Sequence, residues 1–153
     1  MATTTIPGAT LRPARSSDLP AIERLLTDSG LPLAGVADAL DTFTVAESET
    51  QLVGVAGLEV CCDNALLRSV AVMPEWRSRG LGRTLVSHVI ADAAGRGLRG
   101  LYLLTTSAER YFPSFGFRQI TRDEVPADVR ETEEFRTACP ASATVMGRAL
   151  SGG

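Results

Sequence analysis

The sequence predicts one α/β (α+β) domain in which helices flank a mixed, mostly antiparallel sheet, and three observations carry this prediction. The chain has 153 residues, of which 44% are hydrophobic and 22% charged, the composition of an ordinary globular domain. Residues 42–47, 51–60 and 66–73 read as three successive strands separated by turns. A helical pattern over 81–96 and a buried-type strand over 101–105 then complete a β-α-β unit.

In the N-terminal third, the sequence predicts one strand, one amphipathic helix and one further short helix. Residues 10–13 form a short strand, and 1–9 are expected to be a flexible tail that precedes the single domain, 10–153. Asp18 and Pro20 mark a helix start, because a polar cap and a first-turn proline suit the unpaired N–H groups there. The apolar residues Ile22, Leu25 and Leu26 then share one helical face. A second short helix is expected over 36–40.

The hairpin and the C-terminal third follow from turn chemistry and alternation. Asp63-Asn64 predicts a two-residue turn, because these side chains tolerate positive φ, and that register places Glu59 opposite Arg68. The remaining elements are expected at 107–112 (helix), 117–120 (strand), 126–135 (helix) and 143–150 (strand).

The overall composition excludes several classes of function. A formal charge of −3 argues against a nucleic-acid partner, which needs a basic face. No apolar run approaches the roughly 20 residues of a membrane span, and the polar N-terminus lacks the features of a signal peptide. We therefore expect a cytoplasmic protein. Three cysteines and one histidine, without ligand spacing, predict no metal site.

A glycine turn between the 66–73 strand and the 81–96 helix predicts an anion site. Gly80 and Gly82 let a ligand approach the backbone, and the first N–H groups of the helix point outward with the positive end of its dipole. A phosphate or pyrophosphate is the expected guest. The alternative is a tight strand–helix turn without a ligand.

Two motifs identify the family that the chain resembles. The pattern Arg77-x-x-Gly80-x-Gly82 follows a strand that ends in Val70-Ala71-Val72. Further on, 108–112 (AERYF) precedes Gly116-Phe117. Both resemble the signatures of the GCN5-related N-acetyltransferases (GNAT), whose sheet of about six or seven strands has two splayed central strands. The 66–73 and 101–105 strands would be those neighbours.

The resemblance implies acetyl-CoA as the acyl donor in this gap. It assigns the pantetheine arm to the backbone of Val70, Ala71 and Val72. It assigns the pyrophosphate to the N–H groups of eight consecutive residues: Arg77, Ser78, Arg79, Gly80, Leu81, Gly82, Arg83 and Thr84. Three arginines in that run favour anion binding, and the alternative for them is a solvated basic helix start.

Acetyl transfer to an amine calls for a base and an acid. Many family members place a glutamate on the central strand, where this chain has 65–67 (ALL), so Glu59 on the neighbouring strand is the candidate base. Its alternative is a structural pair with Arg68. Tyr111 is the candidate acid for the leaving thiolate, although the family usually places this tyrosine second in the aromatic pair, where this chain has Phe112. Its alternative is simple packing.

Four further segments carry a narrower resemblance: 54–59 (GVAGLE), 66–72 (LLRSVAV), 103–108 (LLTTSA) and 139–143 (CPASA). They are similar to the ArsN-type acetyltransferases, linked to arsenic resistance, with arsinothricin and phosphinothricin as proposed substrates. Both are amino acids with an α-amine and a side-chain oxyanion. Arg68, with Ser69, fits recognition of that oxyanion, and Arg77 is a further candidate.

Other functions stay open at this stage. One alternative is acetylation of another small amine or of a protein N-terminus. A second is a non-catalytic acyl-CoA-binding domain with the same fold. The expected partner is a small-molecule amine, and a homodimer is left open.

Overall fold

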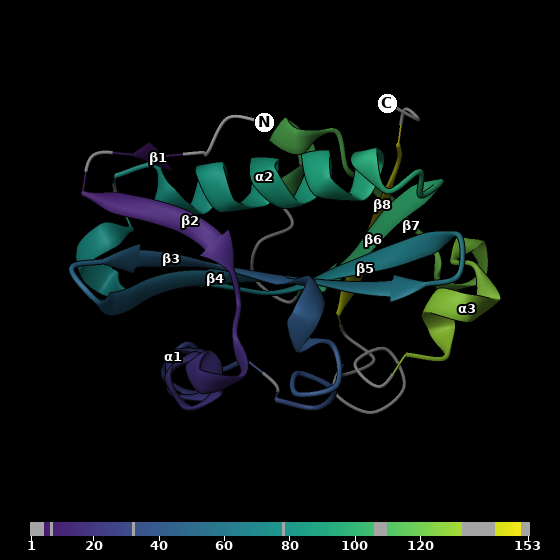
Figure 1. Ribbon diagram of the computed structural model, residues 1–153. Coiled ribbons are helices and arrows are strands. Elements are labelled where there is room, and N and C mark those ends of the chain that lie inside the picture. Colours follow the sequence, from purple (N-terminus) through teal and green to yellow (C-terminus); the bar gives the residue numbers. More distant parts are fainter. Residues whose placement is uncertain are drawn as a thin grey trace.

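The computed structural model describes residues 5–6, 8–31, 33–77, 79–105, 110–132 and 143–150. They form a single sheet with helices on both faces (Figure 1). The strands are β1 (Thr5–Ile6), β2 (Ala9–Pro13), β3 (Phe43–Ser48), β4 (Gln51–Cys61), β5 (Asn64–Val72), β6 (Gly100–Thr105), β7 (Arg118–Ile120) and β8 (Thr144–Ala149). The α-helices are α1 (Leu19–Asp28), α2 (Leu81–Gly95) and α3 (Ala127–Arg130).

The sheet is mixed and mostly antiparallel, as predicted. Its eight described strands run in the order β1-β2-β3-β4-β5-β6-β8-β7. Only the β5–β6 pair is parallel, because α2 forms the crossover between them. The sequence predicted about six or seven strands. The additional strand, β1, has two residues and lies within residues 1–9, which were expected to be a flexible tail. The predicted domain boundaries stay a prediction.

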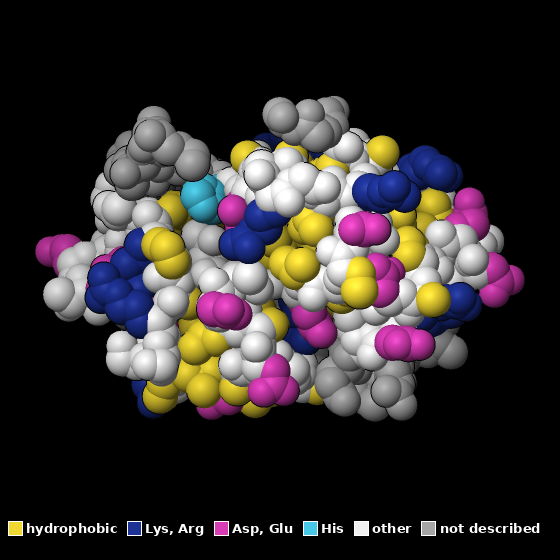
Figure 2. All heavy atoms as spheres, turned by 45° about the vertical axis from the view of Figure 1, so that its right-hand side comes forward, with side chains coloured by type: hydrophobic (Ala, Val, Ile, Leu, Met, Phe, Trp, Pro, Cys, Tyr) yellow, Lys and Arg dark blue, Asp and Glu magenta, His cyan; other side chains and the backbone are white. Residues whose placement is uncertain are grey.

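The helices cover the sheet on opposite faces. Helix α2 packs on one face, and α1 and α3 pack on the other, at opposite ends of the sheet (Figure 1). Helix α1 buries Ile22, Leu25 and Leu26, the apolar face that the sequence predicted. We call the face under α2 the upper face and the face that carries α1 and α3 the lower face. On the side of the molecule shown in Figure 2, basic and acidic side chains are interspersed.

An ion-pair network ties the start of α1 to the first strands. Asp18 accepts hydrogen bonds from the Arg12 guanidinium at 2.8 and 2.9 Å and from the Arg15 backbone N–H at 2.7 Å. Arg12 also donates to Glu47 of β3 at 3.0 Å. The bond from Arg12 is the main reason why the pKa of Asp18 lies below its usual range. These contacts fix the angle at which α1 leaves the sheet.

The β4–β5 hairpin has a different register from the predicted one. Cys61 pairs with Asn64, so the turn consists of Cys62, at a φ of 57°, and Asp63. Glu59 therefore lies opposite Leu66 rather than Arg68. The two registers differ by two residues and keep every side chain on the same face. The hydrophobic pattern therefore could not distinguish them.

Three predicted helices are shorter, displaced or absent in the described residues. Residues 34–39 form turns, followed by a 3₁₀ turn over Leu40–Thr42, where the Thr42 hydroxyl donates to the Ala39 carbonyl at 2.9 Å and so competes with a helix. In the segment 126–135 the helix is limited to α3, and residues from 133 onward lie outside the described ones. Of 107–112, residues 110 and 111 form a turn before a 3₁₀ helix over Phe112–Phe115.

Candidate active site

Strands β5 and β6 separate at the centre of the sheet, as the resemblance implied. Their pairing begins at Asn64 and Gly100 and ends at Leu66 and Tyr102, although β5 continues to Val72. The end of β5 therefore has β4 on one side only. This leaves an edge of unpaired backbone groups inside the sheet, where an extended ligand can bind as an added strand.

The backbone of Val72 faces this opening. The next residue, Met73, donates its N–H to the Val53 carbonyl of β4 at 2.9 Å, and alternation then directs the groups of Val72 away from β4. Its carbonyl accepts a hydrogen bond from Arg77 Nε at 3.0 Å. Arg77 is thus tied to the end of the strand that the sequence assigned to the pantetheine arm.

A β-bulge reshapes β5 beside the opening. Val55 pairs with Ala71 and Gly57 pairs with Arg68, so two residues of β5, Ser69 and Val70, lie opposite one residue of β4. Ser69 adopts a φ of 59°, in the left-handed region. As a result, Val70 and Val72 both pack on the upper face, while Ala71 packs beneath α1 on the lower face.

The turn that leads into α2 has the geometry of an anion cradle. Gly80 is the N-cap residue of α2 at a φ of 83°, and a Cβ placed on it would meet no atom within 4 Å. Among the described residues, no atom therefore blocks the position of a side chain at Gly80, next to the N–H groups of the first turn of α2. Thr84 closes the first turn, since both its N–H and its hydroxyl bind the Gly80 carbonyl. Ser78 of the predicted set lies outside the described residues.

The three arginines of the cradle are held by different neighbours. The guanidinium of Arg79 lies 4.6 Å from the centre of the Trp76 ring, and that of Arg83 lies 4.6 Å from the centre of the Phe115 ring. Arg83 also donates to the Ser114 hydroxyl at 3.1 Å. These contacts place positive charge around the helix start without an internal carboxylate partner for Arg79 or Arg83 among the described residues.

Glu59 and Arg68 form an ion pair on the lower face. Arg68 Nη1 lies 3.0 Å from Glu59 Oε1, and its Nε donates to the Ser69 hydroxyl at 3.1 Å. The Arg68 side chain is fully buried, whereas that of Glu59 is 19% exposed. The two residues are diagonal neighbours across the strands, so the predicted contact exists despite the wrong register. The structure contains the pair that sequence analysis held as the alternative to a base.

Tyr111 lies on the upper face beside the cradle. A Cβ placed on Gly82 would lie 3.4 Å from its hydroxyl oxygen and 3.8 Å from the Val72 side chain. Its ring makes edge contacts with Phe112 and Phe115, both at 5.2 Å between centroids. Burial raises the pKa of Tyr111, and the nearby Arg83 only partly offsets that rise, so its phenol holds its proton well beyond neutral pH.

Phe112, at the usual tyrosine position, is buried in the aromatic cluster, whereas Tyr111 directs its hydroxyl to the end of β5. Glu59 and Tyr111 consequently approach the sheet from opposite faces and at different positions along β5. Glu59 lies opposite Leu66, where the pairing of β5 with β6 ends, whereas the Tyr111 hydroxyl lies near Val72, six residues further along the strand. Ala108 and Glu109 of the second motif, and residues 139–142 of the narrower resemblance, lie outside the described residues.

Comparison with known proteins gives the family. The family model "Acetyltransferase (GNAT) domain" matches residues 39–119, which include the cradle, the opening and Tyr111. The chain belongs to the GNAT acetyltransferase family. This finding confirms the predicted fold and the predicted acyltransferase class, whereas the ArsN type stays a proposal.

The chain is similar to amino-acid acetyltransferases and to solved structures that contain coenzyme A. An amino-acid acetyltransferase of Neisseria meningitidis is 30% identical over 130 residues, covering 79% of this chain and 30% of the relative. The structure of N-acetylglutamate synthase from Neisseria gonorrhoeae, complexed with coenzyme A and N-acetyl-glutamate, superimposes on this chain with a TM-score of 0.81 and 26% sequence identity. The match covers 97% of this chain and 36% of the synthase chain. The structure of Rv2747 from Mycobacterium tuberculosis, in complex with CoA, matches with a TM-score of 0.77 and 26% sequence identity. This match covers 92% of this chain and 98% of the Rv2747 chain.

The chain thus spans less than a third of the length of the Neisseria meningitidis relative. Among the described residues, no group of three or more His, Cys, Asp or Glu side chains could hold a metal ion. No described helix is both long enough and apolar enough to span a membrane.

Proposed function

We propose that this protein is an acetyl-CoA-dependent N-acetyltransferase that acts on the α-amine of a small amino acid with an oxyanion on its side chain. The observation that carries this proposal is the opening between β5 and β6, with the anion cradle and the Tyr111 phenol at the Val72 end and the Glu59 carboxylate beside Leu66, where the opening begins. The similarity to amino-acid acetyltransferases supports the amine class. Arsinothricin and phosphinothricin are the proposed substrates of the ArsN type, and their acetylation would confer resistance.

The cradle fits the pyrophosphate of acetyl-CoA. No described atom blocks the position of a side chain at Gly80, next to its N–H groups, and Arg79 and Arg83 add positive charge on either side. The sequence assigned the amide-bearing arm to the backbone of Val70, Ala71 and Val72; Val72 faces the opening, although its carbonyl already accepts a hydrogen bond from Arg77, and Ala71 pairs with Val55 of β4. When bound, acetyl-CoA supplies an acetyl thioester whose acyl carbon passes to the amine while the C–S bond breaks and the thiol leaves.

Replacing Gly80 by valine should weaken acetyl-CoA binding about tenfold. A β-branched side chain at a φ of 83° is strained by roughly 1–2 kcal/mol, so the cradle relaxes away from its binding geometry. Gly97→Val is the matched control, since Gly97 has a φ of 78°, follows the other end of α2, and likewise has open space where a Cβ would lie. Titration calorimetry with acetyl-CoA checks this. Equal affinity in both variants would remove the cradle from the proposal.

Glu59 accepts, through a chain of water molecules, the proton that the attacking amine gives up, because it lies opposite Leu66, six residues along β5 from the Val72 end where Tyr111 lies. A peptide N-terminal amine costs about 1 kcal/mol to deprotonate at pH 7, against about 4.6 kcal/mol for a lysine-like amine. The α-amine of a free amino acid lies closer to the lysine-like case, because its own ionised carboxylate stabilises the ammonium form, so the reaction depends on a base. Arg68 fixes the carboxylate by its 3.0 Å contact and leaves part of it exposed. The sequence assigned the side-chain oxyanion of the substrate to Arg68 and Ser69; because the Arg68 side chain is fully buried, this contact requires the Glu59–Arg68 pair to separate.

Tyr111 donates its proton to the leaving sulfur. Replacing it by phenylalanine should lower kcat about 10- to 100-fold and leave the KM for acetyl-CoA nearly unchanged, because the ring packing is kept while the proton donor is lost. Steady-state kinetics on purified variants check this, with Tyr102→Phe as the control for a tyrosine on the lower face. Full activity of the Tyr111 variant would assign the proton transfer to water or another group.

The substrate class is tested by offering acetyl-CoA with arsinothricin, phosphinothricin, glutamate, a polyamine and an N-terminal peptide. Mass spectrometry identifies the acetylated product in each case. N-acetylation of the three amino acids with oxyanion side chains is the expected result. Preferred acetylation of the polyamine or the peptide would overturn the substrate assignment and leave the acetyltransferase assignment standing.

A further inference from the structure

A cavity lies on the lower face of the sheet, away from the Glu59–Arg68 pair. It has a volume of about 410 Å³ and lies between α1, the β3–β4 turn and the segment that follows β5. This volume is within the roughly 300–1,000 Å³ range of small-molecule sites. Met73, on its wall, is five residues beyond Arg68, so the cavity is about 15 Å from the ion pair along the strand. One small amino acid cannot occupy both places.

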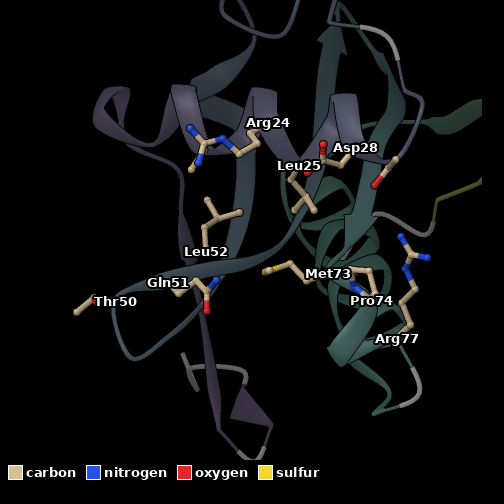
Figure 3. A pocket seen from close by; sticks show the side chains of 11 residues that line it. Arg24, Leu25, Asp28, Thr50, Gln51, Leu52, Met73, Pro74 and Arg77 are labelled. Carbon is tan, nitrogen blue, oxygen red and sulfur yellow. The ribbon is translucent and has the colours of Figure 1, made fainter.

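The walls of the cavity combine an apolar surface with charges of both signs. Figure 3 shows Arg24, Leu25 and Asp28 projecting from α1, with Leu52 and Met73 opposite and Arg77 at one end. Leu25, Leu52, Met73 and Pro74 supply the apolar part.

Three charged side chains line this cavity: Arg24 and Asp28, which are exposed, and Arg77, which binds a strand carbonyl. Within the described ranges, no hydrogen bond or ion pair engages the side chain of Asp28 or Arg24. Arg77 uses only its Nε, which binds the Val72 carbonyl, so its terminal nitrogens remain available there. The Ser29 hydroxyl oxygen on the cavity wall is buried and has no hydrogen-bond partner among the described residues. A buried hydroxyl without a partner is costly.

The placement of these groups determines the ligand chemistry. Asp28 is the last residue of α1, where the helix dipole also favours a cation, so this end of the cavity suits an ammonium group. Arg77 suits a carboxylate, and the apolar surface of Leu25, Leu52, Met73 and Pro74 suits an aliphatic side chain. We propose that this cavity binds an aliphatic α-amino acid at a site separate from the acetyl-transfer site.

Occupancy of the cavity is coupled to the cradle through Arg77. This residue lines the cavity and also binds the end of β5 at the opening. A carboxylate on Arg77 therefore changes the affinity of the cradle for CoA, and CoA changes the affinity for the amino acid by the same factor. The site does not depend on which amine is acetylated, so it can be tested independently of the proposed function.

The test is titration calorimetry of the full chain with three probes: L-leucine, N-acetyl-L-leucine and isopentylamine. L-leucine should bind, and each derivative, which lacks the ammonium or the carboxylate, should bind at least about tenfold more weakly. Leu52→Trp, which fills the cavity, should abolish leucine binding. Asp28→Asn should weaken leucine binding about tenfold, whereas Asp38→Asn, an exposed aspartate away from the cavity, should not change it.

Two controls separate this site from the acetyl-transfer site. Glu59→Gln should bind L-leucine like the wild type, and saturating CoA should shift the leucine affinity without abolishing binding. Absence of leucine binding, equal binding of all three probes, or insensitivity to Asp28→Asn would overturn the proposal. Loss of leucine binding in Glu59→Gln, or complete competition with CoA, would place leucine in the acetyl-transfer site and overturn it as well.

Discussion

Replacing Glu59 by glutamine should lower kcat/KM for the amino-acid substrate by about 10²–10⁴ at neutral pH. The amide keeps the size of the side chain and a carbonyl oxygen toward Arg68, but it cannot accept the proton of the amine. The deficit should be largest at low pH and shrink toward alkaline pH, where more of the amine is already neutral. Steady-state rates measured from acid to alkaline pH check this.

Glu131→Gln is the matched control, because Glu131 is exposed in the turn after α3. It should keep both the rate and the pH profile of the wild type. Circular dichroism of the Glu59 variant establishes that the fold is intact. A folded variant whose pH–rate profile parallels that of the wild type would show that Glu59 serves only as the structural partner of Arg68.

Replacing Arg68 by methionine should lower the free energy of unfolding by about 3 kcal/mol, the lower end of the range for breaking a buried ion pair. The lower end applies because Glu59, which loses its partner, is 19% exposed and is partly solvated. For a chain of this length the change corresponds to a fall in Tm of roughly 10 °C. Thermal and denaturant unfolding measure both quantities.

A double-mutant cycle isolates the contribution of the ion pair. If the ion pair accounts for most of the stability loss, the double variant Arg68→Met/Glu59→Gln should have nearly the same free energy of unfolding as Arg68→Met alone. The reason is that the second substitution removes the carboxylate that has lost its partner. Arg68→Lys should retain part of the stability, since an ammonium keeps the charge without the two-sided contact to Glu59 and Ser69. Strictly additive losses would show that Arg68 stabilises the sheet through its other contacts.

Much of the fold could be predicted from the sequence, because local patterns and global packing agree. Alternation located β3, β4 and β5, and helical spacing located α1 and α2 to within about two residues. The turn before α2 could be predicted from its glycines. Gly80 has a φ of 83°, a conformation that residues with a Cβ rarely adopt. The separation of β5 and β6 followed only from the family resemblance.

The bulge at Ser69 could not be predicted from the pattern. A serine at a φ of 59° gives no sequence signal, and strict alternation would have placed Val70 on the same face as Arg68. The error in the hairpin register arose because Cys62, rather than Asn64, occupies the left-handed position of the turn. In both cases a single backbone dihedral angle, unspecified by side-chain type, decides which groups face the opening.

The sequence predicted where the basic residues of the cradle lie, but not which groups each of them contacts. Proximity in sequence grouped Arg77, Arg79 and Arg83, whereas the structure binds each to a different partner: a strand carbonyl, Trp76 and the Ser114–Phe115 turn. The cavity beside Arg77 combines residues from α1, the β3–β4 turn and the segment after β5, which are distant in sequence. No local pattern brings such residues together.

Free-thiol release from acetyl-CoA, measured with and without an amino acid that bears a side-chain oxyanion, tests the central claim most directly. The account predicts that phosphinothricin or glutamate accelerates thiol release, with one N-acetylated product formed per thiol, and that Glu59→Gln suppresses both together. Binding of acetyl-CoA without thiol release for any amine would contradict it and identify the chain as a non-catalytic acyl-CoA-binding domain.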